Sequence, residues 1–194
     1  ARHAWYVLLE VSSPIAGDAV QKLVESQLGA AIDAGEVEDA VLAKSSKQTR
    51  ELWQLREVMS EVQKHEGGSI KHDASVPTGR VPEFIDRANE LVELMVPGAR
   101  PVPFGHLGDG NIHYNVSQPV GMDKDVYLSN WEALNAAVHE IVRDLGGSIS
   151  AEHGIGRMKR ELLPHAKGAV AMELMRLIKT SFDPNGIFNP GKLL

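Results

Sequence analysis

Two short segments with the alternating pattern of β-strands, residues 101–107 and 111–117, meet at Asp109-Gly110 and restrict the fold more than any other feature. An Asp-Gly pair between two strands is typical of a two-residue type I′ turn, because both central positions of that turn need positive φ. Strand residues in such a hairpin pair symmetrically about the turn. His106 is therefore expected opposite His113, with Cβ atoms roughly 4.5–5.5 Å apart. The sequence predicts an antiparallel ladder that carries two imidazoles on one face.

The rest of the chain mixes helical and strand patterns without a repeat or an interdomain linker. Residues 5–11 would form a buried strand with almost no leader before it, as if the chain had been cut from a longer one. Short strands interspersed with helices, together with a hairpin, favour an α+β fold with a largely antiparallel sheet flanked by helices. Further strands are expected at 41–43, 70–76 and 148–151, and helices at 17–33, 47–65, 81–96, 124–145, 156–162 and 168–181.

Composition excludes several classes of function. The chain has 20 Lys and Arg against 26 Asp and Glu, and the two signs are scattered, so no basic footprint points to nucleic acid or to anionic lipid. The absence of cysteine excludes a disulfide framework and a thiolate metal site, so a metal would be held by His, Asp or Glu. Apolar runs are short and the N-terminus lacks a signal-peptide core. We therefore expect a soluble cytoplasmic or organelle-matrix protein with no membrane span.

A further cluster of reactive side chains lies in the stretch from Ser148 to Gly156, which is expected to run from a strand into a helix through two glycines. Glu152 would complete a His-His-Glu set with the two hairpin histidines. Such a set suits Zn²⁺ or Mn²⁺ and leaves positions open for water or substrate. His153 would then be free as a base, and Asn115 would share the histidines' strand face. The alternatives are a surface histidine pair and a solvated loop carboxylate.

Three other side chains are candidates for binding an acidic substrate. Arg56 lies on the apolar stripe of its expected helix, where an unpaired charge is costly, and its guanidinium matches a carboxylate. Ser60 lies one helical turn further along the same face. Lys71 shares a strand face with Asp73 and would add a second positive charge. The alternatives are an arginine that snorkels to water and a solvated edge lysine.

Five motifs in order along nearly the whole chain resemble the C-terminal domain of FAD-linked oxidases. This flavoprotein family is related to vanillyl-alcohol oxidase and includes dehydrogenases of D-lactate, glycolate and D-2-hydroxyglutarate type. The motifs are Leu55-Arg56-Glu57, Lys71 to Pro77, Gly105 to Asn115, Ser150 to Gly156, and Asp183 to Lys192.

The resemblance implies that residues 1–194 form a ferredoxin-like cap domain over a flavin. The FAD-binding domain would be absent from the chain, which would then have little or no dehydrogenase activity alone. In the metal-dependent members, residues matching His106, His113 and Glu152 hold Zn or Mn, and the position of His153 supplies the base. Residues matching Arg56, Ser60, Lys71 and Asn115 bind the substrate carboxylates, although Ser60 departs from a threonine often found there. The tail with Asn189 and Lys192 is similar to the segment that returns toward the FAD; its alternative is a plain turn.

The chemistry expected from the resemblance is oxidation of a D-2-hydroxy acid to the 2-oxo acid by hydride transfer to the flavin. Two cationic side chains favour a dicarboxylate such as 2-hydroxyglutarate over lactate or glycolate. The electron acceptor and the oligomeric state stay open, a homodimer included. Two other classes of function also stay open, a metal-dependent hydrolase and a non-catalytic binding or assembly module.

Overall fold

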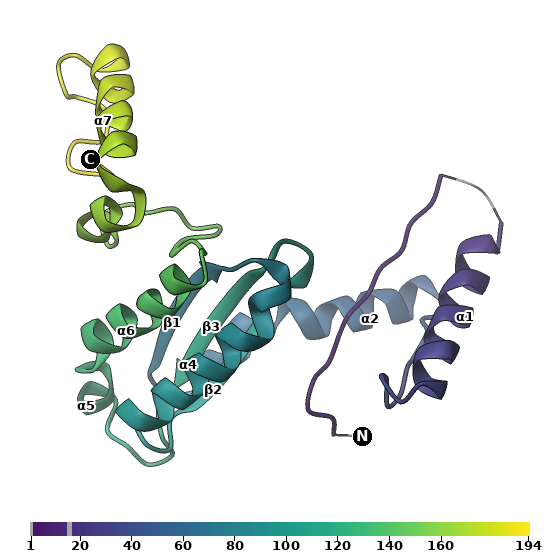
Figure 1. The fold of residues 1–194 in the computed structure, drawn as a ribbon. Helices are drawn as coiled ribbons and strands as arrows, with labels where there is room; N and C mark the ends of the chain where they lie inside the picture. The colour runs from purple at the N-terminus through teal and green to yellow at the C-terminus, as the bar shows by residue number, and fades with distance from the viewer. Residues whose placement is uncertain (1, 15–16) are drawn as a thin grey trace. The chain divides into compact units, whose positions relative to one another are not determined.

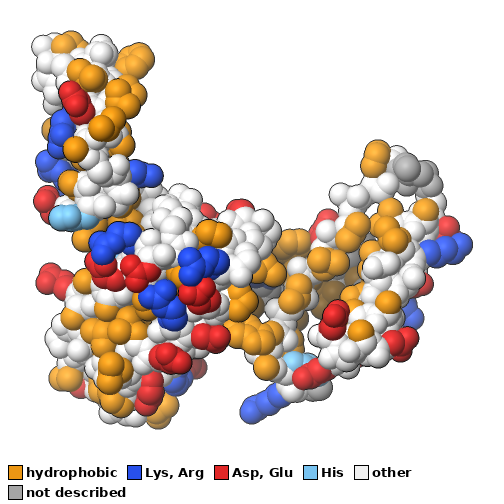
Figure 2. Space-filling view, in the orientation of Figure 1, with side chains coloured by type: hydrophobic (Ala, Val, Ile, Leu, Met, Phe, Trp, Pro, Cys, Tyr) orange, Lys and Arg blue, Asp and Glu red, His pale blue; other side chains and the backbone are white. Residues whose placement is uncertain are grey.

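The computed structural model describes residues 2–14 and 17–194, and the chain divides into two compact units, residues 1–62 and 63–194. The first unit is helical and the second contains a sheet with covering helices (Figure 1). Among the described helices, none is long and apolar enough to cross a membrane. On the visible face of the molecule, acidic and basic side chains are interspersed (Figure 2).

The first unit contains α1 (Ala19–Asp33), α2 (Ser46–Glu57) and α3 (Met59–Val62). The Ser45 hydroxyl accepts a hydrogen bond from the Gln48 N–H at 3.3 Å and so caps α2. The expected strands at 5–11 and 41–43 are wrong, because neither segment joins a ladder and Trp5 to Val11 are exposed. A strand needs a neighbour for its backbone N–H and C=O groups, and the described part of this unit offers only helices and loops.

The second unit contains a three-stranded antiparallel sheet in the order β1-β3-β2. Its strands are β1 (Ser69–Ser75), β2 (Arg100–His106) and β3 (Asn111–Ser117). A bridge between Ser75 and Ser148 adds the start of a fourth strand beside β1. With α4 (Val81–Met95) after β1 and α6 (Trp131–Asp144) after β3, this order is the ferredoxin-like βαββαβ arrangement. The expected α+β class is confirmed.

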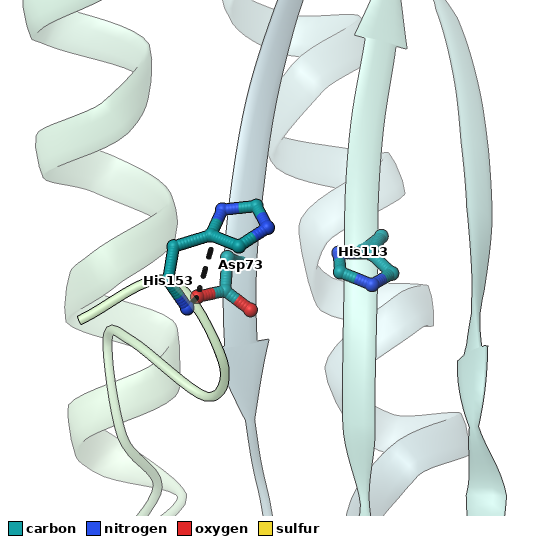
Figure 3. A group of neighbouring side chains, drawn as sticks. All are labelled: Asp73, His113 and His153. Carbon is teal, nitrogen blue, oxygen red and sulfur yellow. Dashed lines mark hydrogen bonds and ion pairs between the residues drawn. The ribbon is translucent and has the colours of Figure 1, made fainter. Parts of the chain in front are cut away.

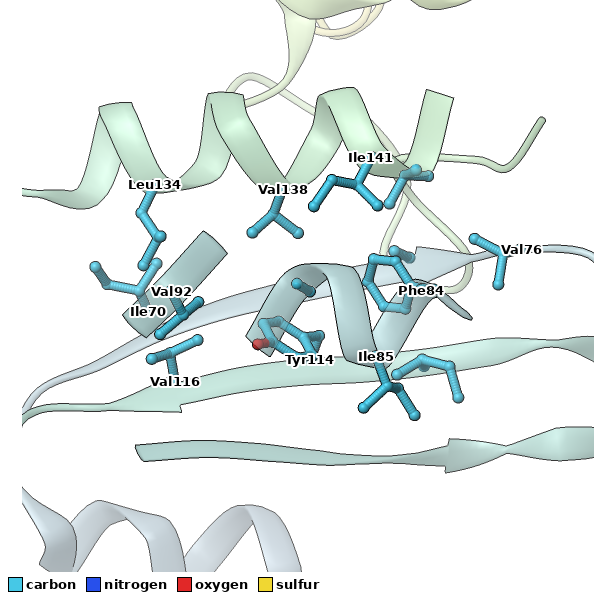
Figure 4. Packing of buried hydrophobic residues seen from close by; sticks show 14 of the residues in the cluster. Ile70, Val76, Phe84, Ile85, Val92, Tyr114, Val116, Leu134, Val138 and Ile141 are labelled. Carbon is cyan, nitrogen blue, oxygen red and sulfur yellow. The ribbon is translucent and has the colours of Figure 1, made fainter. Parts of the chain in front are cut away.

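Both helices cover the same face of the sheet (Figure 4). Alternate strand residues and one stripe of each helix are apolar, so the two patterns meet in a single buried layer. The opposite face carries the polar members of the same strands. The fully buried residues of the layer include Ile70, Ala74, Phe84, Ala88, Val92, Tyr114, Val116, Leu134, Val138 and Val142.

Several helices are shorter than their sequence patterns predict. The expected helix at 124–145 is divided into α5 (Lys124–Leu128) and α6, because the Asn130 side chain donates to the Tyr127 carbonyl at 3.0 Å and competes with the helical backbone. The expected helix at 47–65 is divided into α2, α3 and the 3₁₀ turn η1 (Gln63–Glu66). The expected strand at 148–151 is reduced to the single bridge.

The C-terminal part contains the 3₁₀ turn η4 (Arg160–Leu162) and α7 (Leu163–Phe182). The helix expected at 156–162 is thus only a short turn. Within α7, Gly168 adopts φ 74°, which kinks the helix. The 3₁₀ turns η2 (Thr78–Arg80) and η3 (Leu107–Asp109) complete the elements of the second unit.

Candidate metal and substrate site

The hairpin that carries the two predicted imidazoles has a longer loop than expected. Leu107–Asp109 form η3, and Gly110 closes the loop in the left-handed region with φ 71° and ψ 15°. A Cβ on Gly110 would lie 1.9 Å from the Val76 carbonyl oxygen, so only glycine fits there. The prediction of a two-residue type I′ turn is therefore wrong, because the chain forms a 3₁₀ turn before the glycine.

The longer loop changes which residues pair. His106 lies opposite Asn111, and His113 lies opposite Phe104. The predicted direct opposition of His106 and His113 is therefore wrong. The register differs from the expected one by two residues, and an even shift keeps every side chain on its expected face. Both imidazoles consequently remain on the polar face as diagonal neighbours.

The polar face also receives side chains from β1. Lys71 pairs with Asn115, and Asp73 pairs with His113. Lys71 is exposed and Asn115 is buried. The Asn115 amide nitrogen donates to the Gln63 side-chain oxygen at 2.6 Å, a contact that the sequence pattern did not predict.

The loop with Glu152 and His153 is attached to the end of β1. Ser75 and Ser148 exchange two backbone hydrogen bonds of 2.9 and 2.8 Å. Gly147 precedes this bridge, and a Cβ there would lie 2.2 Å from the Ser75 carbonyl oxygen. The two glycines that the sequence singled out, Gly154 and Gly156, are not approached in this way, since no atom lies within 4 Å of where their Cβ would be.

Asp73 accepts hydrogen bonds from the loop through a carboxylate that is 4% exposed. Its Oδ2 accepts from the backbone N–H groups of Ala151 at 3.1 Å, Glu152 at 3.1 Å and His153 at 2.9 Å. The Ser150 hydroxyl adds a contact at 3.3 Å. Burial acts to raise the pKa of the Asp73 carboxyl, but the N–H groups of His153 and Glu152 outweigh it, so the pKa is lowered.

Glu152 lies against both predicted metal-binding histidines. Its Oε1 is 3.8 Å from the His106 Nε2, and its Oε2 is 3.5 Å from the His113 Nε2. The Asn111 amide nitrogen donates to Oε1 and orients the carboxylate. Side chains from the two strands of the hairpin and from a distant loop therefore come together.

A second set of candidate ligands overlaps the first. Ligand atoms of Asp73, His113 and His153 lie within 4.8 Å of one another (Figure 3). The Asp73 Oδ2 accepts four donors from the loop, and its Oδ1 accepts the Glu152 N–H at 3.2 Å, so a metal at this second set would share the carboxylate with the loop. The Glu152 side chain is 44% exposed and retains acceptor capacity. The two sets are alternative cation sites that share His113.

His153 lies next to this set with its side chain 69% exposed and its Nδ1 3.9 Å from the Asp73 Oδ2. Its ring stacks on that of His113 with centroids 5.9 Å apart. A cavity of about 320 Å³ opens beside Glu152, large enough for a small acid. Its lining is rich in hydroxyl and carboxylate groups and includes Ser75, Asp109, Ser148 and Ser150.

The remaining predicted site residues lie elsewhere in the chain. Arg56 is half-buried in the last turn of α2, and Ser60 is exposed in α3. Both belong to the first unit, and the helix is interrupted at Val58 between them, so they do not share one continuous helical face. Asn189 has φ 47°, and its carbonyl accepts from the Lys192 N–H at 3.2 Å, which makes this segment a tight turn.

Asp73 is the site residue that sequence reasoning missed. Its strand face was predicted, because Asp73 alternates in step with Lys71. Its contact with the loop could not be predicted, because that loop lies almost eighty positions later in the chain. The sequence pattern indicated only that Asp73 lies on the polar face of its strand, and it assigned no contact to the carboxylate.

Comparison with known proteins supports the resemblance seen in the motifs. Residues 1–193 match the family described as FAD linked oxidases, C-terminal domain. The chain is 40% identical over 189 residues to a D-2-hydroxyglutarate dehydrogenase from Stutzerimonas stutzeri (strain A1501), a match that covers 97% of this chain and 40% of the relative. It is 36% identical over 191 residues to the mitochondrial D-2-hydroxyglutarate dehydrogenase of Bos taurus, covering 98% of this chain and 34% of the relative. The chain thus spans between a third and two fifths of the length of these relatives.

Proposed function

This chain belongs to the C-terminal domain family of FAD-linked oxidases, and from that membership we propose that it forms the substrate- and metal-binding part of a flavin-dependent dehydrogenase. The reaction is the oxidation of a D-2-hydroxy acid to the 2-oxo acid. The observation that carries the proposal is the position of Glu152 between His106 and His113, at 3.8 and 3.5 Å, with His153 beside it.

The donor set fits a divalent metal. Two imidazole nitrogens and one carboxylate suit Zn²⁺ or Mn²⁺, and three protein ligands leave positions for a substrate. His106, His113 and Glu152 would hold the ion. When bound, the metal supplies Lewis acidity that lowers the pKa of a coordinated alcohol.

The neighbouring side chains supply base and binding functions. His153 takes the hydroxyl proton, a task that suits an imidazole, and its ring is exposed. Lys71 and Asn115, paired across β1 and β3, orient a substrate carboxylate. FAD would supply the hydride acceptor, so that the substrate would lose one proton and one hydride overall.

Arg56 and Ser60 complete the binding set in this proposal. A guanidinium and an ammonium group match the two carboxylates of a dicarboxylate such as D-2-hydroxyglutarate, the substrate class in the names of the relatives. Asn189 and Lys192 would lie near the cofactor. We expect the FAD to be held mainly outside this chain, so the purified chain should carry no stoichiometric flavin.

Zn²⁺ binding by the purified chain tests the metal part of the proposal. We expect the chain to bind one Zn²⁺ ion. Its melting temperature should rise with Zn²⁺ and rise further when D-2-hydroxyglutarate is added, because a ligand at 100 times its Kd stabilises the folded chain by about 2.7 kcal/mol. The substitution Glu152→Gln should lower Zn²⁺ affinity by more than the roughly 10- to 100-fold typical of an outer partner. The control is His165→Ala, an exposed histidine outside the cluster. Equal Zn²⁺ affinity in the Glu152→Gln variant and the parent chain would contradict the proposed site.

A further inference from the structure

We infer that Asp73 is a positioning residue, a built-in anion that holds the loop of residues 150–153 and thereby aims Glu152 and His153 at the site. The inference deepens the proposed function and rests on it for the roles of those two side chains. The contact itself is a property of the loop backbone. It can therefore be measured without metal or substrate.

The loop backbone has the geometry of an anion-binding nest. The N–H groups of Ala151, Glu152 and His153 are consecutive in the chain, and all three donate to the Asp73 Oδ2 at 2.9 to 3.1 Å. Consecutive N–H groups that converge in this way bind phosphates and other anions in many proteins. Here the anion is a side chain of the same molecule, presented from β1 (Figure 3).

The loop depends on this contact because its own side chains point to solvent or to the site. Glu152 and His153 are 44% and 69% exposed, so neither anchors the backbone by burial. Gly154 follows directly with φ +74°, and no atom lies within 4 Å of where its Cβ would be. The Asp73 carboxylate is therefore the buried group that fixes the backbone position of Glu152 and His153.

Lys159 attaches the same junction at a second point. Its ammonium group donates to the Ile149 carbonyl oxygen at 2.5 Å and to the Asp73 carbonyl oxygen at 3.4 Å. It thus links the residue before the loop to the strand residue that binds the loop. The two charged side chains together join β1 and the loop across almost eighty positions of sequence.

The nest binds a single oxygen that shares the negative charge of the carboxylate. Alanine offers no acceptor at that point, whereas the amide oxygen of asparagine still accepts the three N–H groups but carries no charge. Removal of the carboxylate should therefore loosen the loop and leave a small anion-sized space.

The test compares Asp73→Ala and Asp73→Asn with the parent chain, using Zn²⁺ as the probe. We expect Asp73→Ala to lose about 10- to 100-fold in Zn²⁺ affinity, the range for groups that orient a ligand, and Asp73→Asn to lose less, because its amide oxygen still accepts from the loop. Formate should restore the affinity of Asp73→Ala in a saturable manner, and chloride at equal ionic strength should not. Formate should fail with Asp73→Asn, because its side chain still fills the nest. The control is Asp86→Ala, an exposed aspartate on α4.

Amide hydrogen exchange separates this inference from the proposed function. In the metal-free parent chain, the amides of Ala151, Glu152 and His153 should be protected, and Asp73→Ala should lose that protection and regain it with formate. If the parent binds no Zn²⁺, the proposed function fails while the exchange result still decides the inference. If Asp73→Ala does not fold, the isosteric Asp73→Asn supplies the comparison. Protected loop amides or unchanged Zn²⁺ affinity in both variants would overturn the inference, and so would unprotected amides in the metal-free parent.

Discussion

Two buried histidines behind the site make the stability of the second unit sensitive to acid. His72 lies on the core face of β1, and His139 lies on the facing side of α6, with ring centroids 5.9 Å apart. The His72 Nδ1 lies 2.7 Å from the Tyr114 carbonyl oxygen and must donate to it, since a carbonyl only accepts. The His72 Nε2 and both ring nitrogens of His139 have no hydrogen-bond partner among the described residues. Burial lowers the pKa of each imidazole from 6.5 to about 4.

The size of the acid effect follows from these pKa values. Because the pKa of each imidazole is lower in the folded chain than in the unfolded chain, the unfolded chain binds more protons between about pH 6.5 and 4. The free energy of unfolding therefore falls as the pH is lowered through this window. Between pH 7 and pH 5 the linkage relation gives a loss of roughly 2 kcal/mol for each histidine, and roughly 4 kcal/mol together. That is a large part of the 5–15 kcal/mol typical of a domain.

Urea unfolding at pH 7 and pH 5 measures this loss. The matched variant is His139→Leu, which removes one imidazole from the apolar layer and leaves the carboxylates that also titrate in this range. We expect the variant to lose about 2 kcal/mol less than the parent chain between the two pH values. The reasoning is refuted if parent and variant lose the same stability, or if the His139 ring titrates near pH 6.5 by NMR.

Three further substitutions test the sheet and its core. Gly105→Ala should lower the free energy of unfolding, measured in urea, by about 3 kcal/mol or more, because the added Cβ would lie 2.0 Å from the Asn111 carbonyl oxygen. Gly108→Ala is the control, since no atom lies within 4 Å of its Cβ position, and should change the free energy of unfolding by less than about 0.5 kcal/mol. Phe84→Ala should cost about 3–5 kcal/mol by the same assay, since this ring is fully buried and meets the Tyr114 ring edge-on at 5.5 Å. Tyr114→Phe should lower the free energy of unfolding by only about 1 kcal/mol, the value of the one hydrogen bond that the hydroxyl donates to the Asn89 side-chain oxygen at 2.9 Å. A larger loss would contradict this explanation.

Local patterns were sufficient for four elements of the second unit. The strands at 70–76, 101–107 and 111–117 and the helix at 81–96 appear within one residue or so of their expected bounds. Each has a period that matches its secondary structure and an apolar face that meets the common core. The α+β class followed from these elements.

Local patterns failed for two other segments, each for its own reason. Residues 5–11 have the composition of a strand, but composition cannot supply a neighbour for the ladder. The helix at 124–145 has a continuous apolar stripe, yet the Asn130 side chain takes a backbone carbonyl and ends the first piece. In each case the hydrogen bonding open to the backbone, rather than the local propensity, decided the secondary structure.

The sequence by itself determined the residue types of the site and the sheet face on which each lies. Strand alternation has a period of two, so His106 and His113 stayed on one face even though their register was mistaken by two residues. Only the tertiary structure decided that Glu152 reaches both imidazoles and that Asp73 binds the loop. The reason is that three loop N–H groups converge on one buried carboxylate from almost eighty residues away, and no local pattern records such a contact.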